Sequence, residues 1–252
     1  MSSELAASLI ATNLARIRDK IAATCRRASR AESEVALMAV SKMHPAEAIL
    51  DAHAAGLRLF GENRVQEFAE KSPAVAHLAG AEFHLIGPLQ SNKTTRAAEL
   101  FHAIDSVDSL KIAARLSSAA AALNKKPPIL IEVKLSHEES KHGTAPAELP
   151  ALLEALAPLE SLIPSGLMTV PPWPADLDNA GEEARPYFRE LRRLRDASLP
   201  VCPTLTQLSM GMSNDFAAAI EEGSTCIRIG TALFGKRVYP EPPSTTNQAA
   251  SD

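Results

Sequence analysis

Cysteine is scarce in this chain of 252 residues, and the cysteines form no recognisable motif. There are three, Cys25, Cys202 and Cys226, and none belongs to a CxxC pair. An odd number of cysteines argues against a disulfide framework and favours a reducing compartment. The sequence therefore predicts a cytoplasmic protein whose fold does not depend on disulfide bonds.

Long apolar runs, a basic surface and abundant aromatic residues are also missing. No apolar run approaches the ~20 residues that a membrane-spanning helix needs, and the N-terminal stretch MSSELAASLIATNLARIRDK lacks the charge order of a signal peptide. Aromatic residues make up only 4% of the chain, and the net charge is -4. Proteins that bind nucleic acids usually show the opposite balance. We expect neither a membrane nor a nucleic acid as a partner.

Short apolar runs alternate with longer segments of helical periodicity along the rest of the chain. The candidate strands are residues 35–40, 57–60, 82–86, 101–105, 129–135, 163–169, 204–208 and 225–229. Helical patterns fill the gaps between them, near residues 45–55, 64–79, 91–99, 108–123, 146–158, 180–197 and 213–222. This alternation is typical of a parallel β-sheet.

The number of candidate strands favours a closed barrel. Eight strands with helices between them, and no second fold-sized region, predict an α/β protein with a single (β/α)8 TIM barrel. An additional amphipathic helix at residues 4–28 is expected on the outside of the barrel, beside the last strand. We expect the barrel domain to span residues 1–239, and the polar, proline-rich residues 240–252 to form a disordered tail.

The residues that follow the candidate strands are small, polar or cationic, which suits an anionic carbonyl compound. In barrels of this kind the functional residues lie at the carboxyl ends of the strands. At these positions stand Ser41, Lys42, Asn63, Ser209, Ser213, Arg228, Gly230 and Thr231.

The loops after the last two candidate strands predict a phosphate site. Such barrels frequently bind phosphate after strands seven and eight, at a helix N-terminus. Ser213 is expected to be the N-cap of a helix, and Gly211 lets the backbone come close to a ligand. Gly230 leaves the next loop open, and Thr231 supplies a hydroxyl at the start of another helical turn. Each hydroxyl alone is typical of an ordinary helix cap, but the two together favour phosphate.

Lys42 indicates which chemical group lies at the other end of the ligand. A lysine in apolar surroundings near other cations has reason to lose its proton, and the neutral amine can form a Schiff base. Combined with a phosphate site, this indicates a phosphorylated aldehyde, of which pyridoxal 5'-phosphate is the obvious example. Arg228 is expected to point inward, because Ile227 and Ile229 would point outward, and thus to face the pyridine nitrogen.

Two further motifs are weak. The segment GPLQSNKT at residues 87–94 resembles a phosphate-binding P-loop, but Asn92 replaces the glycine that should precede the lysine. His137 and His142 lie five positions apart and lack the HExxH order of a zinc site. We therefore expect no metal ion in this protein.

Several stretches of the chain together resemble the pyridoxal phosphate homeostasis proteins, which are single-domain relatives of the alanine racemase barrel. The resemblance extends from about residue 5 to about residue 237 and rests on MAVSKMHP, GLRLFGENRVQE, FHLIGPLQSNK, IDSVDS, IEVKLSHEESKHG, GLMTVPP and LSMGMSNDFAAAIEEGSTCIRIGTALFG. It implies a barrel of the alanine racemase N-terminal type, with pyridoxal phosphate as a Schiff base on Lys42. The implied cofactor-binding residues are Lys42, Asn63, Ser209, Ser213, Arg228, Gly230 and Thr231.

Differences from alanine racemase imply a protein without catalytic activity. That enzyme has a second, β-rich domain whose tyrosine works opposite the lysine, and we expect this chain to lack it. Val170 stands where the racemase pattern has a histidine. Racemisation by two bases needs an acid–base group on each face of the substrate carbanion. The resemblance implies instead a monomeric protein that takes part in intracellular pyridoxal phosphate homeostasis and supplies the cofactor to apoenzymes.

Two alternative functions use the same lysine. One is a pyridoxal phosphate-dependent racemase or amino-acid lyase that acts through Lys42 alone. The other is a phosphosugar enzyme in which Lys42 forms a Schiff base with a substrate aldehyde. The three hypotheses differ in whether the protein retains pyridoxal phosphate and whether it converts an amino acid.

Overall fold

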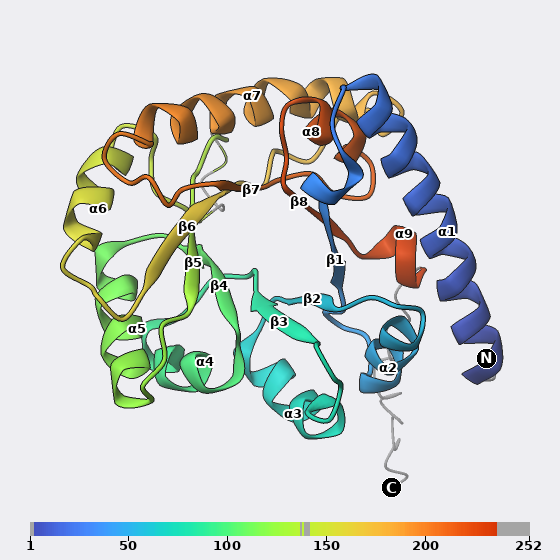
Figure 1. The fold of residues 1–252 in the computed structure, drawn as a ribbon, viewed down its shortest axis with the longest axis horizontal. Helices are drawn as coiled ribbons and strands as arrows, with labels where there is room; N and C mark the ends of the chain where they lie inside the picture. The colour runs from blue at the N-terminus through green and yellow to red at the C-terminus, as the bar shows by residue number, and fades with distance from the viewer. Residues whose placement is uncertain (1–2, 137, 139–141, 236–252) are drawn as a thin grey trace, which may run out of the picture.

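The computed structural model describes residues 3–136, 138 and 142–235, and in it parallel strands close into a barrel. The strands follow one another around the barrel in chain order, and β1 pairs with β8 to close it (Figure 1). They are β1 (Ala36–Val40), β2 (Leu59–Glu62), β3 (Glu82–Leu85), β4 (Ala103–Val107), β5 (Pro128–Glu132), β6 (Ile163–Met168), β7 (Gln207–Ser209) and β8 (Cys226–Ile229). The predicted (β/α)8 barrel is confirmed.

Helices surround the barrel on its outer side (Figure 1). They are α1 (Ser3–Arg27), α2 (Ala46–Ala54), α3 (Val65–Val75), α4 (Thr94–Leu100), α5 (Leu110–Ala122), α6 (Leu149–Leu156), α7 (Ala180–Ser198), α8 (Phe216–Glu221) and α9 (Thr231–Phe234), with short 3-10 turns at Glu32–Glu34 and Ser91–Lys93. The expected tail at residues 240–252 lies outside the described residues. The proposed limit of the domain at residue 239 therefore stays a prediction.

The N-terminal helix α1 packs on the outer side of the barrel, where β1 pairs with β8. It lies along α8, α9 and α2, beside β1 and β8 (Figure 1). The side-chain amide of Asn13 donates to the main-chain oxygen of Leu233 at 3.0 Å, and so connects α1 to α9. The expected place of this helix beside the last strand is confirmed.

Alternation along the strands separates a helix-facing core from the barrel interior. Ile227 and Ile229 of β8 are fully buried in the hydrophobic core, whereas Arg228 between them lines an internal cavity. On the outside of β3, the ring of Phe83 lies 4.7 Å from that of Phe68 on α3, between ring centroids. Such aromatic contacts add to the free energy gained by burying the rings. The apolar strand faces therefore anchor the helices, and the interior holds Arg228 together with apolar residues such as the buried Met38, its neighbour across β1 and β8.

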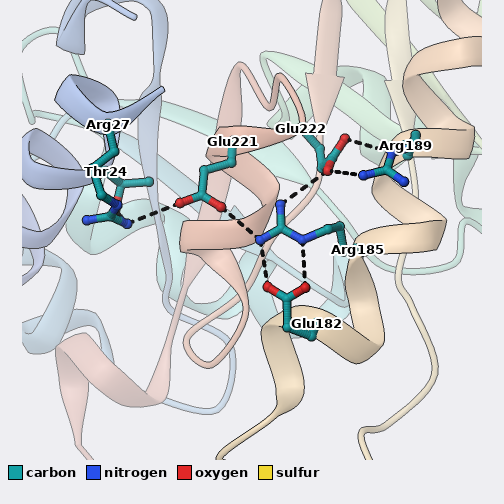
Figure 2. Close-up of polar contacts among 7 residues, drawn as sticks. All are labelled: Thr24, Arg27, Glu182, Arg185, Arg189, Glu221 and Glu222. Atoms are coloured by element: carbon teal, nitrogen blue, oxygen red, sulfur yellow. Dashed lines mark hydrogen bonds and ion pairs between the residues drawn. The ribbon is translucent and has the colours of Figure 1, made fainter. Parts of the chain in front are cut away.

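An ion-pair network connects three of the surrounding helices (Figure 2). The guanidinium of Arg185 on α7 donates at 2.7–3.1 Å to three carboxylates, those of Glu182, Glu221 and Glu222. Arg27 of α1 donates to Glu221, and Arg189 of α7 donates to Glu222. The network holds α1 and α7 against the C-terminal end of α8.

The described residues form neither a membrane-spanning helix nor a metal site. None of the helices within these ranges is both long and apolar enough to cross a membrane. No three histidine, cysteine, aspartate or glutamate side chains gather there in a way that could hold a metal ion. His137 lies outside the described residues. The cysteines Cys25, Cys202 and Cys226 form no disulfide bond.

Candidate functional site

A cavity of about 630 Å³ opens at the carboxyl ends of the strands. Six of the residues predicted from the sequence line it, although they come from distant parts of the chain: Lys42, Asn63, Ser213, Arg228, Gly230 and Thr231. Among the described residues of its lining, the cations Lys42, Lys134 and Arg228 outnumber the single carboxylate, Glu132. The charge of the cavity therefore suits an anionic ligand such as a phosphate ester.

The backbone on both sides of Lys42 is held by buried polar groups. The hydroxyl of Ser41 donates to Glu62 at 2.8 Å, and the ammonium of Lys71 donates to the main-chain oxygen of Ser41 at 3.0 Å. On the other side, the amide of Met43 donates to the carboxylate of Glu67. Met43 has a φ of 62°, a left-handed conformation that non-glycine residues seldom adopt. The loop is thus fixed in the conformation that directs Lys42 into the cavity.

Lys71 joins two carboxylates beneath this loop. Its ammonium lies 3.0 Å from Glu62 and 2.7 Å from Glu67. Burial raises the pKa of Glu62, although the charge of Lys71 and the hydroxyl of Ser41 act in the opposite direction. The pKa of Glu67 is lowered, because hydrogen bonds from Lys71 and Met43 outweigh the effect of burial. The sequence placed Glu62 after a strand but gave no sign that Lys71 pairs with it.

Arg228 crosses the interior of the barrel from β8. Its side chain donates to the hydroxyl of Ser209 at 2.8 Å and to the main-chain oxygen of Thr169 at 2.7 Å. Burial lowers the pKa of the guanidinium, while the nearby acidic groups Asp105, Asp215 and Glu132 favour its charged form. The predicted inward direction of Arg228 is confirmed. Ser209 is fully buried and does not belong to the described lining of the cavity, so it supports Arg228 from behind.

Ser213, Gly230 and Thr231 meet at one end of the cavity. The amide of Ala232, in the first turn of α9, donates to the hydroxyl of Ser213 at 3.3 Å. Thr231 opens this short helix, as predicted, and Gly230 precedes it. Hydroxyl groups and the unpaired amides of a helix start are the donors that commonly bind phosphate.

The predicted role of Ser213 as a helix N-cap is wrong. Helix α8 begins at Phe216, and its N-cap is Asp215, whose carboxylate accepts a hydrogen bond from the amide of Met212. Residues 213–215 form a turn before α8, and the backbone that leads into this turn passes through Gly211, which has a φ of 96°. A Cβ atom at that position would lie 2.5 Å from the Cβ of Ala219. Ser213 is therefore free of α8 and faces α9 instead.

Asn63 lines the cavity directly after β2. The loop after β3 packs closely against it, because a Cβ atom at Gly87 would lie 2.3 Å from the main-chain oxygen of Asn63. Gly87 is thus required at this contact. Its main-chain oxygen also accepts the hydroxyl of Ser106 at 2.6 Å, which fixes the loop from the other side.

Glu132, Ser136 and Trp173 are among the cavity residues that were not predicted as site residues from the sequence. Burial raises the pKa of Glu132 to about 7, an effect that Arg228 opposes and Asp108 reinforces. One carboxylate oxygen of Glu132 and the hydroxyl of Ser136 are buried without a hydrogen-bond partner among the described residues. Glu132 falls inside a predicted strand, and its alternation with the apolar residues of that strand was the signal that could have indicated an inward position.

Barrel and cavity define a class of protein, and comparison with known proteins agrees. The sequence model of the family described as alanine racemase, N-terminal domain, matches residues 12–238. The solved structure of alanine racemase from Clostridium difficile 630 superposes with a TM-score of 0.69 at 16% identity, covering 92% of this chain and 60% of that one. At this identity the likeness concerns the fold alone. The chain is thus a barrel of the alanine racemase N-terminal type, as the sequence predicted.

More similar relatives identify the family. Pyridoxal phosphate homeostasis proteins are 46% identical in Pseudomonas aeruginosa PAO1, covering 94% of this chain and 100% of the relative, and 44% identical in Escherichia coli K12, covering 91% and 97%. The structure of PipY from Synechococcus elongatus with pyridoxal phosphate bound has a TM-score of 0.79 and 41% identity, and covers 90% of this chain and 100% of that one. The chain belongs to the pyridoxal phosphate homeostasis protein family.

Proposed function

We propose that this protein binds pyridoxal 5'-phosphate as a Schiff base on Lys42 and serves in intracellular homeostasis of the cofactor. The observation that carries the proposal is the meeting of Lys42 with Arg228, Ser213 and Thr231 in one cavity of excess positive charge. A phosphate group and an aldehyde need these two kinds of partner. The relatives' name and the pyridoxal phosphate in the PipY structure support it further.

Each residue of the site has a distinct part in this proposal. Ser213, Gly230 and Thr231 would hold the phosphate, and Lys42 the aldehyde carbon. Arg228, held by Ser209, would donate to the pyridine nitrogen, and Asn63 would contact the ring. When bound, pyridoxal phosphate supplies an aldehyde and an electron-withdrawing ring. A permanently charged donor such as arginine keeps the ring nitrogen unprotonated, which weakens the ring as an electron sink.

The proposal assigns the protein a carrier role without catalysis, as a cytoplasmic monomer that supplies the cofactor to apoenzymes. Val170 lines the cavity where the racemase pattern has a histidine. A second candidate function is a racemase or lyase, and one observation favours it. Glu132, on the side of the barrel opposite Lys42, has a pKa of about 7, which is suitable for a general base.

Titration of the cofactor-free protein with pyridoxal phosphate tests the binding proposal. A visible absorption band is expected for the wild type and for Lys134→Ala, which alters another lysine of the same cavity. The band is expected to disappear in Lys42→Ala, while some cofactor stays bound through its phosphate. A wild-type protein that gains no band would contradict the proposal.

Incubation of the loaded protein with single L-amino acids separates the carrier from the enzyme. The carrier role predicts no D-isomer and no keto acid by chiral chromatography. Steady turnover that Glu132→Gln abolishes would overturn the carrier role and establish the second candidate.

A further inference from the structure

One side of the cavity carries none of the residues proposed to bind the cofactor. Lys42, Asn63, Arg228, Gly230 and Thr231 belong to β1, β2 and β8 or directly follow them. The strands opposite are β5 and β6 (Figure 1). The part of the lining that comes from β5, β6 and the loops after them is here called the β5–β6 wall. It contains Glu132, Val133, Lys134, Ser136, His142, Val170, Trp173 and Leu177.

The inner part of the β5–β6 wall carries polar groups in need of a partner. Glu132 is 9% exposed and Ser136 is 6% exposed. A carboxylate oxygen of Glu132 and the hydroxyl of Ser136 have no hydrogen-bond partner in the part of the chain that the structure describes. Buried polar atoms without partners destabilise a protein. The two atoms have almost no exposed surface, but both residues line the cavity, where a ligand or water could supply the missing partner. Both atoms can accept a hydrogen bond from a ligand.

The outer part of the β5–β6 wall is apolar and exposed. Trp173 is 74% exposed and Leu177 is 55% exposed, yet both line the same cavity as Glu132. Large apolar side chains at the opening of a cavity commonly contact ligands. The face of an indole ring also attracts cations and alkylammonium groups. The wall thus changes from apolar at its rim to an acidic acceptor inside.

We propose that the β5–β6 wall is a binding subsite for a primary ammonium group carried on an apolar stem. The stem would lie against Trp173 and Leu177, and the ammonium would donate to Glu132 and Ser136. An ammonium has three donors and no acceptor, which matches two unpartnered acceptor atoms. This inference goes beyond cofactor binding and does not depend on it. Lys134 also lines the cavity, so the rival ligand is an apolar anion.

The fluorescence of Trp173 reports on the subsite, because it is the one tryptophan of the chain. We would titrate the cofactor-free protein with n-pentylamine, 1-pentanol and pentanoate, which each have five carbons in a linear chain and differ in charge. The amine is expected to bind at least about tenfold more tightly than the alcohol. Equal binding of amine and alcohol, or tighter binding of pentanoate, would overturn the proposal.

Variants assign the effect to residues. Glu132→Gln keeps the shape and removes the charge, and is expected to weaken pentylamine binding by about tenfold or more. Glu154→Gln, on the exposed side of α6, is the matched control and should bind like the wild type. Calorimetry on Trp173→Leu should show weaker binding as well. If Glu132→Gln binds pentylamine as tightly as the wild type, the subsite does not exist.

Two sources of the ammonium are separable in the same assay. A short peptide with a central lysine presents the group as a protein would, whereas n-pentylamine presents it as a free metabolite. Binding of the peptide at least as tightly as the amine identifies a protein lysine, and exclusion of the peptide identifies a free amine. Borohydride reduction in the presence of pyridoxal phosphate tests the cofactor proposal separately. A protein that binds pentylamine but takes up no cofactor label contradicts the cofactor proposal alone. A protein that takes up the label but does not bind pentylamine contradicts the subsite alone.

Discussion

The ammonium of Lys71 on α3 lies 3.0 Å from the main-chain oxygen of Ser41, the residue that precedes Lys42. The same ammonium pairs with Glu62, whose side chain is fully buried. A helix outside the barrel therefore holds the backbone of the loop that carries the proposed cofactor lysine. The position of Lys42 depends on this contact as well as on the end of β1.

Replacing Lys71 by methionine is expected to destabilise the protein by about 3 kcal/mol, because it leaves the buried carboxylate of Glu62 without its cation. Urea unfolding followed by circular dichroism measures the change. Lys111→Met, at an exposed position of α5, is the control and should change the stability little. Adding Glu62→Gln to Lys71→Met should recover part of the loss, since the unpaired charge is then gone. A single variant as stable as the control would contradict the proposed support of the loop.

The hydrogen bond from Arg228 to Ser209 is expected to contribute to cofactor binding. Ser209→Ala removes the hydroxyl that accepts from the guanidinium, and the proposed cofactor site should lose about threefold to tenfold in affinity for pyridoxal phosphate. Titration by absorbance gives the affinity. Ser118→Ala, on the exposed side of α5, should leave the affinity unchanged. An equal loss in both variants would show that the effect is not specific to Arg228.

A histidine–aspartate pair inside the barrel predicts a dependence of stability on pH. His84 on β3 lies 3.1 Å from Asp105 on β4. Burial acts to lower the pKa of His84, but the charge and hydrogen bond of Asp105 outweigh it, so the pKa is raised. The stabilisation by this pair is therefore complete below the unfolded pKa of about 6.5 and is lost as the pH rises through the folded pKa.

Thermal unfolding of the wild type and of His84→Gln between about pH 5 and pH 9 isolates this contribution. The difference in stability between the two proteins should be largest at the acidic end and shrink towards the alkaline end. His102, whose pKa is lowered by burial, acts in the opposite direction in both proteins. A difference that grows with pH would contradict the raised pKa of His84.

The network around Arg185 predicts a loss of stability on acidification. Hydrogen bonds from Arg185 and Arg27 lower the pKa of Glu221. A carboxylate whose pKa is lowered by folding stabilises the fold at pH values above its unfolded pKa of about 4.3. This stabilisation is lost as the pH falls through the folded pKa. Arg185→Ala should cost about 1 kcal/mol at neutral pH, since the pairs are partly exposed, and flatten this acid dependence. Arg193 pairs with Glu190 within α7 and, among the described residues, connects no other helix. Arg193→Ala should therefore change the stability and its acid dependence less.

The fold could be predicted from the sequence because the barrel depends on local patterns. The apolar run before Ser41 and Lys42 marked β1, and the alternation of Ile227, Arg228 and Ile229 placed one cation inside the barrel. These features repeat within a few residues, and strand ends in a parallel barrel meet at one side. Six of the predicted residues accordingly share one cavity.

Contacts between distant elements could not be predicted in the same way. Nothing in the spacing of Glu62 and Lys71 indicated their pairing, since it depends on how α3 packs on β2. The N-cap prediction for Ser213 is wrong because both it and Asp215 are good N-cap residues, and residues 213–215 form a turn before α8 begins. Trp173 lies in a polar, proline-rich loop whose place over the cavity emerges only when β6 is closed against β5 and β7.

Mass spectrometry of the borohydride-treated protein shows whether Lys42 holds the cofactor. After incubation with pyridoxal phosphate, reduction and digestion, the account predicts one phosphopyridoxyl group on the peptide that contains Lys42. The same treatment of Lys42→Ala should leave that peptide unlabelled. A wild-type protein with no label, or with its label on other lysines and none on Lys42, would contradict the account.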